Sequence, residues 1–99
     1  MTRFRVEVIG GPVYLVSGDQ GRLERLGFST VRWVEAESGE EADQIARGMV
    51  LSQLSKKRPS NPPDQPVELT TQVTRLSPLE SSKHKDPGRG FTFFPYDVN

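Results

Sequence analysis

The side chains able to carry out acid–base or metal chemistry are few in this sequence. The chain has one histidine, His84, in a polar stretch, and no cysteine. A single histidine supplies neither a two-histidine metal site nor, without an oriented partner, the base of a catalytic triad. The acidic residues gather in one stretch: Glu35, Glu37, Glu40, Glu41 and Asp43. This stretch is typical of a strand end followed by the first turn of a helix. We therefore predict no catalytic residue, no metal site and no cofactor, and a protein that is not an enzyme.

An aromatic segment and two basic clusters point to a different chemistry, the binding of nucleic acid. The segment from Arg89 to Tyr96, RGFTFFPY, resembles the RNA-recognition-motif signature, whose aromatic rings stack on bases. In that fold the strand lies in the middle of the domain, whereas here only residues 97–99 follow, and Pro95 interrupts the ladder. The candidate nucleic-acid contacts are Lys56, Lys57, Arg58, Lys83, Lys85, Arg89 and Tyr96. Single-stranded nucleic-acid binding is thus an alternative to solvated loop charges and phenylalanines packed in a core.

Length and charge limit the class of protein. The chain has 99 residues, and 13 basic side chains balance 13 acidic ones. Its length fits one domain, residues 1–99, and a net charge of zero creates no overall field toward nucleic acid or an anionic membrane. No apolar run fits a signal peptide or a membrane span, and the absence of cysteine favours the cytoplasm. We expect a soluble cytoplasmic protein without a membrane partner.

Alternating hydrophobicity predicts several strands. Phe4, Val6 and Val8 alternate with charged residues, and Gly10-Gly11-Pro12 is expected to end that strand. Further strands are predicted at 13–16, 28–36, 67–76 and 91–94, with 22–26 open between one helical turn and an irregular strand. In the central strand one face carries Phe28, Thr30, Arg32, Val34 and Ala36, and the other carries Val31 and Trp33.

One helix is predicted between the strands. Ser38 and Glu41 have the spacing of a capping box, and apolar residues then follow at helical intervals as far as Leu54. Two long polar loops, at about 55–66 and 77–90, are expected to be mobile. The prediction is an α+β fold in β-β-β-α-β-β order, an antiparallel four- to five-stranded sheet with the helix on one face.

A single helix covers only one face of such a sheet. The opposite face, on which Trp33 or Phe28 would be prominent, is then an exposed apolar surface of the kind that forms interfaces. The leading hypothesis is a non-enzymatic interaction or regulatory module that self-associates through its sheet or binds an unknown protein partner. The candidate anchors are Phe28, Trp33, Phe91, Phe93 and Phe94.

Two blocks of the sequence resemble a family of short uncharacterised bacterial proteins. Residues 27–36, followed by Glu40-Glu41-Ala42, are similar to that family's GFYTTRFVEA-like strand, which leads into an amphipathic helix. Residues 90–95 are similar to its GFTFYP-like C-terminal block. Ser29 and Val31 replace a tyrosine and a threonine of that pattern. The resemblance implies a small intracellular bacterial protein and transfers no activity or functional residue.

Overall fold

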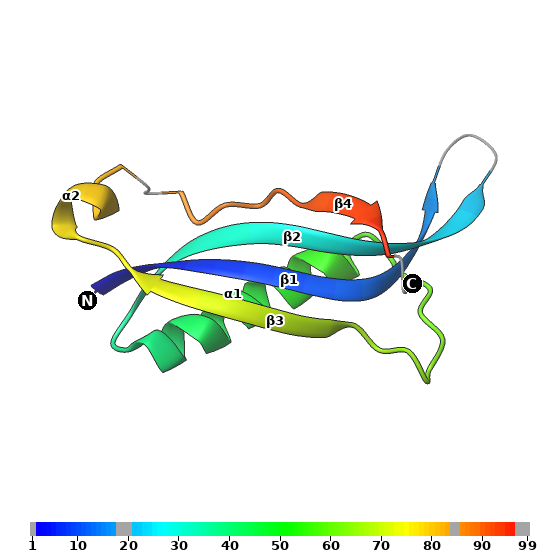
Figure 1. Cartoon of the computed structure of the whole chain (residues 1–99), viewed down its shortest axis with the longest axis horizontal. Helices are drawn as coiled ribbons and strands as arrows, with labels where there is room; N and C mark the ends of the chain where they lie inside the picture. The colour runs from blue at the N-terminus through cyan, green and yellow to red at the C-terminus, as the bar shows by residue number, and fades with distance from the viewer. Residues whose placement is uncertain (1, 18–20, 84–85, 97–99) are drawn as a thin grey trace.

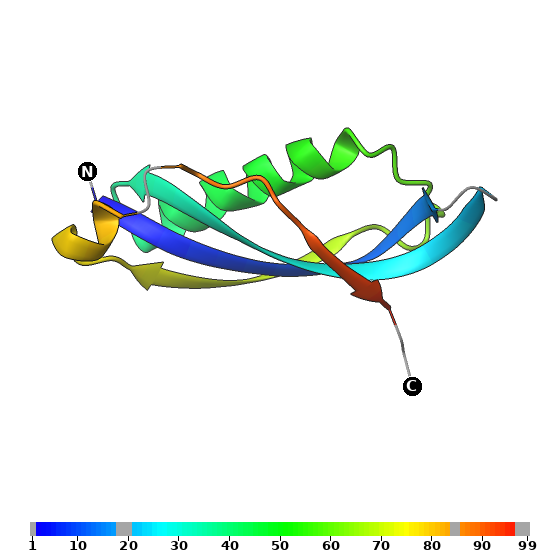
Figure 2. The ribbon, with the colours of Figure 1, turned by 90° about the horizontal axis from the view of Figure 1, so that it is seen from above.

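The fold is a four-stranded antiparallel sheet with one long helix on one face. The computed structural model describes residues 2–17, 21–83 and 86–96. The elements in chain order are β1 (Thr2–Ser17), β2 (Arg22–Ala36), α1 (Gly39–Ser55), β3 (Glu68–Arg75), α2 (Pro78–Ser81) and β4 (Thr92–Pro95). The strand order in the sheet is β3-β1-β2-β4 (Figure 1). Seen from above, α1 lies along one side of the curved sheet (Figure 2). The predicted α+β class and the single main helix are therefore confirmed.

The first part of the sheet differs from the prediction, because three expected strands form two long ones. Gly10-Gly11-Pro12 does not end β1, and the pairing with β2 only shifts between Gly10 and Val13. The peptide bond between Gly11 and Pro12 is cis. Glycine is needed at position 10 for space, since a Cβ there would lie 2.6 Å from Cζ of Phe28. Residues 22–26 continue β2, so of the two alternatives left open the strand is right.

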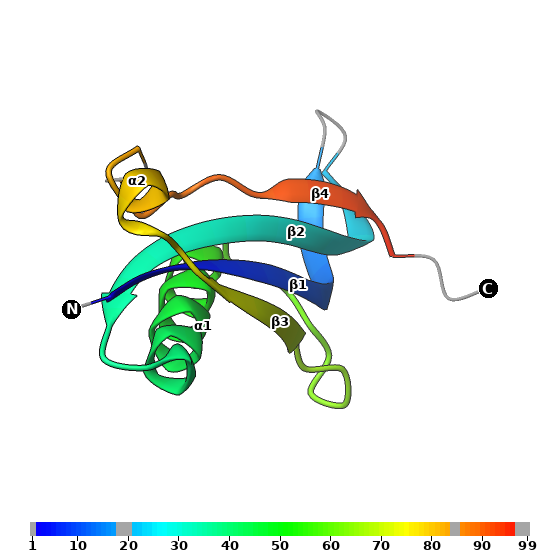
Figure 3. The ribbon, with the colours of Figure 1, turned by 60° about the vertical axis from the view of Figure 1, so that its left-hand side comes forward.

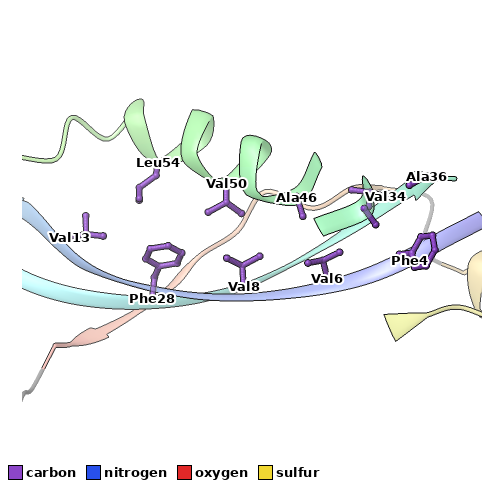
Figure 4. Close-up of a cluster of buried hydrophobic side chains, with 11 residues drawn as sticks. Phe4, Val6, Val8, Val13, Phe28, Val34, Ala36, Ala46, Val50 and Leu54 are labelled. Carbon is purple, nitrogen blue, oxygen red and sulfur yellow. The ribbon is translucent and has the colours of Figure 1, made fainter. Parts of the chain in front are cut away.

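Helix α1 begins where the capping pattern predicts. The Ser38 hydroxyl accepts a hydrogen bond from the backbone N–H of Glu41 at 3.1 Å, which satisfies one of the donors that a helix N-terminus leaves unpaired. The buried stripe of the helix consists of Ala42, Ala46, Val50 and Leu54. Figure 4 shows the last three pointing toward the valines and phenylalanines of β1 and β2. The core therefore lies between α1 and the face of the sheet beneath it. None of the described helices has the length and apolar character needed to cross a bilayer.

The two long segments predicted to be mobile loops make specific contacts. The Asn61 side chain accepts from the N–H of Tyr14 at 3.0 Å and donates to the carbonyls of Pro12 and Gln65 at 2.7 and 2.8 Å. Asn61 thus satisfies the edge of β1 beyond the end of β3. The second segment contains α2 and pairs with β2 through the N–H of Trp33, which donates to the Pro87 carbonyl at 3.0 Å. Polar groups of both segments thus bond to strand edges, and the mobility of these loops stays a prediction.

Candidate interaction surface

The face of the sheet opposite α1, called the open face below, is mixed in polarity rather than apolar. Cross-strand partners share a face, so the register assigns it these residues: Arg3, Arg5, Glu7, Ile9, Ser29, Val31, Trp33, Glu35, Glu68, Thr70, Gln72, Thr74, Thr92 and Phe94. Arg3 bonds Glu35 at 2.9 Å, and Arg5 lies 3.7 Å from Glu7. The expectation of a broadly apolar face is therefore wrong, since an antiparallel sheet with one face in water alternates apolar and polar residues.

An apolar group does occupy one end of the open face. Ile9 and Phe94 are 47% and 40% exposed, and Tyr96 lies beside them. The two rings approach the backbone closely at glycines. A Cβ on Gly27 would lie 2.5 Å from Cε1 of Phe94, and a Cβ on Gly11 would lie 2.7 Å from the Tyr96 ring. We call Ile9, Phe94 and Tyr96 the aromatic patch. Its two rings pack directly on the backbone of Gly27 and Gly11.

Polar groups border the aromatic patch. The Arg25 guanidinium lies over the Tyr96 ring, 4.7 Å from its centroid, a favourable cation–π arrangement. A cavity of about 180 Å³ is lined by the patch together with Glu68 and Thr70 of β3. The arrangement is an apolar centre with a polar rim, which is the anatomy of a protein-binding surface.

The five predicted anchors do not share one surface. Phe28 is fully buried beneath α1, so its prediction as an exposed anchor is wrong. Phe91 and Phe93 are half-buried on the same side, with ring centroids 5.4 and 6.3 Å from that of Phe28. The reason is register: Phe93 pairs with Phe28, and Phe94, the next residue, points to the open face. Only Phe94 and Trp33 lie where the hypothesis needs them.

Trp33 is only half-buried, and part of the segment after α2 covers it. Gly88 lies against the indole, since a Cβ on that glycine would be 3.5 Å from Cζ3 of Trp33. The backbone of Trp33 is bonded to Pro87, as described above. Its placement on the open face agrees with the prediction, whereas its role as an anchor stays a prediction.

The residues predicted to contact nucleic acid do not form one group. Lys56 and Arg58 are exposed after α1, and Lys83 follows α2, at the opposite end of the molecule (Figures 1 and 2). Lys57 lies over the rings of Phe91 and Phe93, with its Nζ 6.0 and 5.7 Å from their centroids. Exposed Arg89 precedes β4, and Tyr96 belongs to the aromatic patch. Lys85 and His84 lie outside the described residues.

Arg32 is a residue whose importance sequence reasoning missed, although it placed the side chain on the correct face. The side chain is fully buried and donates to Gln53 Oε1 from Nε at 3.0 Å and from Nη2 at 2.6 Å. Nη1 donates to the Gly90 carbonyl at 3.2 Å and to Thr30 Oγ1. The guanidinium also lies 5.2 Å from the Phe91 centroid. Arg32 therefore joins β2 to α1 and to the segment that leads into β4.

The charge of Arg32 has no acidic partner among the ion pairs of residues 2–17, 21–83 and 86–96. Burial lowers the pKa of its guanidinium from the ordinary value, since desolvation disfavours the charged form. The sequence does contain a sign of this role, because Arg32 lies among apolar residues on one face of the predicted strand at 28–36. An arginine buried at such a position must bond to neutral acceptors or to a carboxylate inside the fold.

Asp43 is the other residue with a shifted pKa. A hydrogen bond from the Thr71 hydroxyl, and then hydrogen bonding and charge from Arg47, hold the pKa of its carboxyl below the ordinary value, against the opposing effect of desolvation. Asp43 and Arg47 bond at 3.0 Å, and Arg47 also donates to Thr71 Oγ1 at 3.2 Å. These contacts join α1 to β3, so the shift has a structural cause. Within the described residues no three histidine or acidic side chains gather as metal ligands would.

Comparison of the chain with protein-family models, with curated proteins and with solved structures finds no match to any of them. The resemblance to the bacterial family therefore stays a prediction.

Proposed function

We propose that this protein is a non-enzymatic protein-interaction module that binds its partner through the open face, centred on the aromatic patch. The observation that supports this is the exposure of Ile9 and Phe94 beside Tyr96, on the side of the sheet opposite α1. Aromatic side chains held rigidly lose little conformational entropy when they bind, and they commonly dominate interface energies. The glycines beneath Phe94 and Tyr96 hold the rings close to the sheet.

A projecting hairpin arm extends this surface. The last residue of β1 paired with β3 is Gly11, and β4 pairs with β2 no earlier than Leu26, so beyond these points β1 and β2 continue as a two-stranded hairpin (Figure 3). Val16 and Leu23 are cross-strand partners on the arm and are 63% and 52% exposed. A partner that contacts the patch and the arm together would cover the apolar side chains at this end.

The test is capture of partners from a lysate of the source cell by the tagged protein and two variants. In Ile9→Ser the patch loses its aliphatic centre; in Leu79→Ser, the matched control, an equally apolar side chain that is 72% exposed is removed from α2. We expect a protein partner that survives nuclease, that is lost with Ile9→Ser and that is retained with Leu79→Ser. Equal retention by both variants would contradict the proposal.

Nuclease treatment separates the proposal from its alternative. If removal of nucleic acid strips every bound protein, the aromatic patch is a stacking surface for bases, and Tyr96→Ala abolishes the binding. Trp33→Ala tests the remaining predicted anchor: sedimentation and capture that match wild type would exclude Trp33 from the surface.

A further inference from the structure

Strand β3 is an edge of the sheet with little protection against pairing. It lies first in the strand order, and in the described part of the chain its strand partner is β1 alone. Its sequence, ELTTQVTR, contains no proline and no lysine, the residues with which proteins usually block an exposed edge. Its charged residues stand at its two ends, Glu68 and Arg75.

The hydrogen bonds of β3 show which of its backbone N–H and C=O groups point away from β1 and are free to pair with another strand. Leu76, just after β3, donates its N–H to Arg3 of β1 at 3.0 Å. The Leu69 carbonyl instead accepts from Arg47 of α1 at 3.4 Å. Since the N–H and C=O of one strand residue point to the same side and those of the next residue to the other, the even-numbered residues bond to β1. The backbone groups of Leu69, Thr71, Val73 and Arg75 therefore point outward.

We propose that β3 pairs antiparallel, edge to edge, with β3 of a second copy of the chain, about a two-fold axis at Thr71. This inference goes beyond the proposed function, because it names a second copy of the chain as a further partner, bound at the β3 edge rather than on the open face. Antiparallel pairing brings the Glu68 end of one strand beside the Arg75 end of the other, whereas parallel pairing would bring like charges together. The two-fold symmetry makes the interface self-complementary.

The side chains fix the register. With Thr71 opposite Thr71, Leu69 of each copy lies opposite Val73 of the other, on the side of the sheet that carries α1, where both are half-buried. A shift of the axis to Gln72 would place Leu69 opposite Arg75 instead. Apolar cross-strand pairs stabilise a sheet, and an apolar side chain opposite a charged one does not. Thr71 already binds the neutral pair of Asp43 and Arg47, so no net charge flanks the axis.

The hydrogen bonds of this register are available. Leu69 and Val73 of opposite copies exchange both of their backbone hydrogen bonds, as do the two Thr71 residues. The Leu69 carbonyl, which receives the long bond from Arg47, retains a second lone pair. On the open face, exposed Thr70 then faces exposed Gln72 of the other copy in a closely spaced pair.

The proposal is tested by placing charged side chains at Thr70 and Gln72 and measuring the monomer–dimer equilibrium by sedimentation over a range of protein concentrations. We expect wild type to dimerise, and T70K/Q72K and T70E/Q72E each to raise the dissociation constant about tenfold or more, because each places like charges opposite one another. An equimolar mixture of the two variants should restore the dimer. The control Q44K/S52K adds the same charge at exposed positions of α1 and should dimerise as wild type does. Circular dichroism establishes that each variant is folded.

Disulfide formation checks the register independently in a chain that has no cysteine of its own. Upon oxidation T70C/Q72C should cross-link two copies, whereas Q72C alone should not. Cross-linking by Q72C alone would move the axis to Gln72 and overturn the register.

A wild type that stays monomeric at about 1 mM, or a T70K/Q72K variant as dimeric as wild type, would overturn the inference itself. Ile9→Ser leaves the β3 edge intact, so the two proposals can fail separately. If the wild type is monomeric but still loses its captured partner with Ile9→Ser, only the β3 pairing is refuted. If the wild type dimerises but Ile9→Ser captures the partner as well as wild type does, only the open-face proposal is refuted.

Discussion

Arg32 provides the sharpest test of how this fold is held together. Arg32→Ala removes both hydrogen bonds to Gln53 Oε1 and the ring contact with Phe91. A half-buried acceptor left without its charged donor costs about 1–3 kcal/mol, and the cavity left by the side chain costs about 2 kcal/mol more. We expect a total loss of about 3–5 kcal/mol in the free energy of unfolding. For a urea dependence of about 1.5 kcal/mol per molar, the unfolding midpoint falls by about 2–3 M.

Two further variants separate the hydrogen bonds from the volume. Arg32→Met keeps most of the apolar stem, so its loss should be about 1–2 kcal/mol, arising mainly from the unpaired Gln53. In Arg32→Met/Gln53→Leu neither polar group remains, and stability should return to within about 1 kcal/mol of wild type. Arg5→Ala, on the open face, is the control and should change stability by less than about 0.5 kcal/mol. A loss below about 1 kcal/mol for Arg32→Ala, or a double variant no more stable than Arg32→Met, would refute the reasoning.

Three other substitutions test the core, the Asp43 contact and the packing of Phe94 on Gly27, each by urea unfolding. Phe28→Ala should cost about 3–5 kcal/mol because the ring is fully buried, and half-exposed Phe94→Ala clearly less; equal losses would contradict the register of β4. Because the folded-state pKa of Asp43 is lowered, its carboxylate adds stability above the unfolded pKa near 4 and loses it as the pH falls through the folded value. The stability difference between wild type and Asp43→Asn should therefore shrink as the pH falls below about 4, and a pH-independent difference would exclude this contact. Gly27→Ala should destabilise by about 1–3 kcal/mol because its Cβ would meet the Phe94 ring, whereas Gly48→Ala, in open space on α1, should stabilise by about 0.5–1 kcal/mol; the same sign for both would be inconsistent with the packing.

Features that depend on residues close together in the sequence were predicted correctly. The capping of α1 by Ser38 and the stripe that ends at Leu54 follow from helical spacing and from the donors at a helix end, and both are present. The alternation in residues 28–36 correctly separated the side of Phe28 from the side of Trp33. Which side the helix would cover could not be read from that alternation, because Arg32 makes the buried side look polar. Arg32 can be buried because Gln53 and Gly90, which are distant in the sequence, provide neutral acceptors for its guanidinium.

The misread part of the sheet has a related cause. The pair Gly10-Gly11 indicates a break in the strand, because glycine commonly ends strands, whereas here the two glycines provide room for the rings of two distant residues, Phe28 and Tyr96. The side-by-side placement of Ile9 and Tyr96 likewise depends on pairing between segments far apart in the chain. No local pattern contains that information, so the aromatic patch emerges only from the three-dimensional arrangement.

The order of the strands has a consequence for how the chain folds. β1 and β2 are neighbours in sequence and form a hairpin by local contacts, whereas Phe4 must find Arg75 and Ser29 must find Thr92 before the outer strands can pair. Closing such long loops costs entropy that is recovered only when the contacts form, so we expect the hairpin to form first and the outer strands to dock afterwards and more slowly. Until they dock, the hairpin would have two unpaired edges, and we expect chains at high concentration to be most prone at that stage to pair with one another instead of with their own β3 and β4.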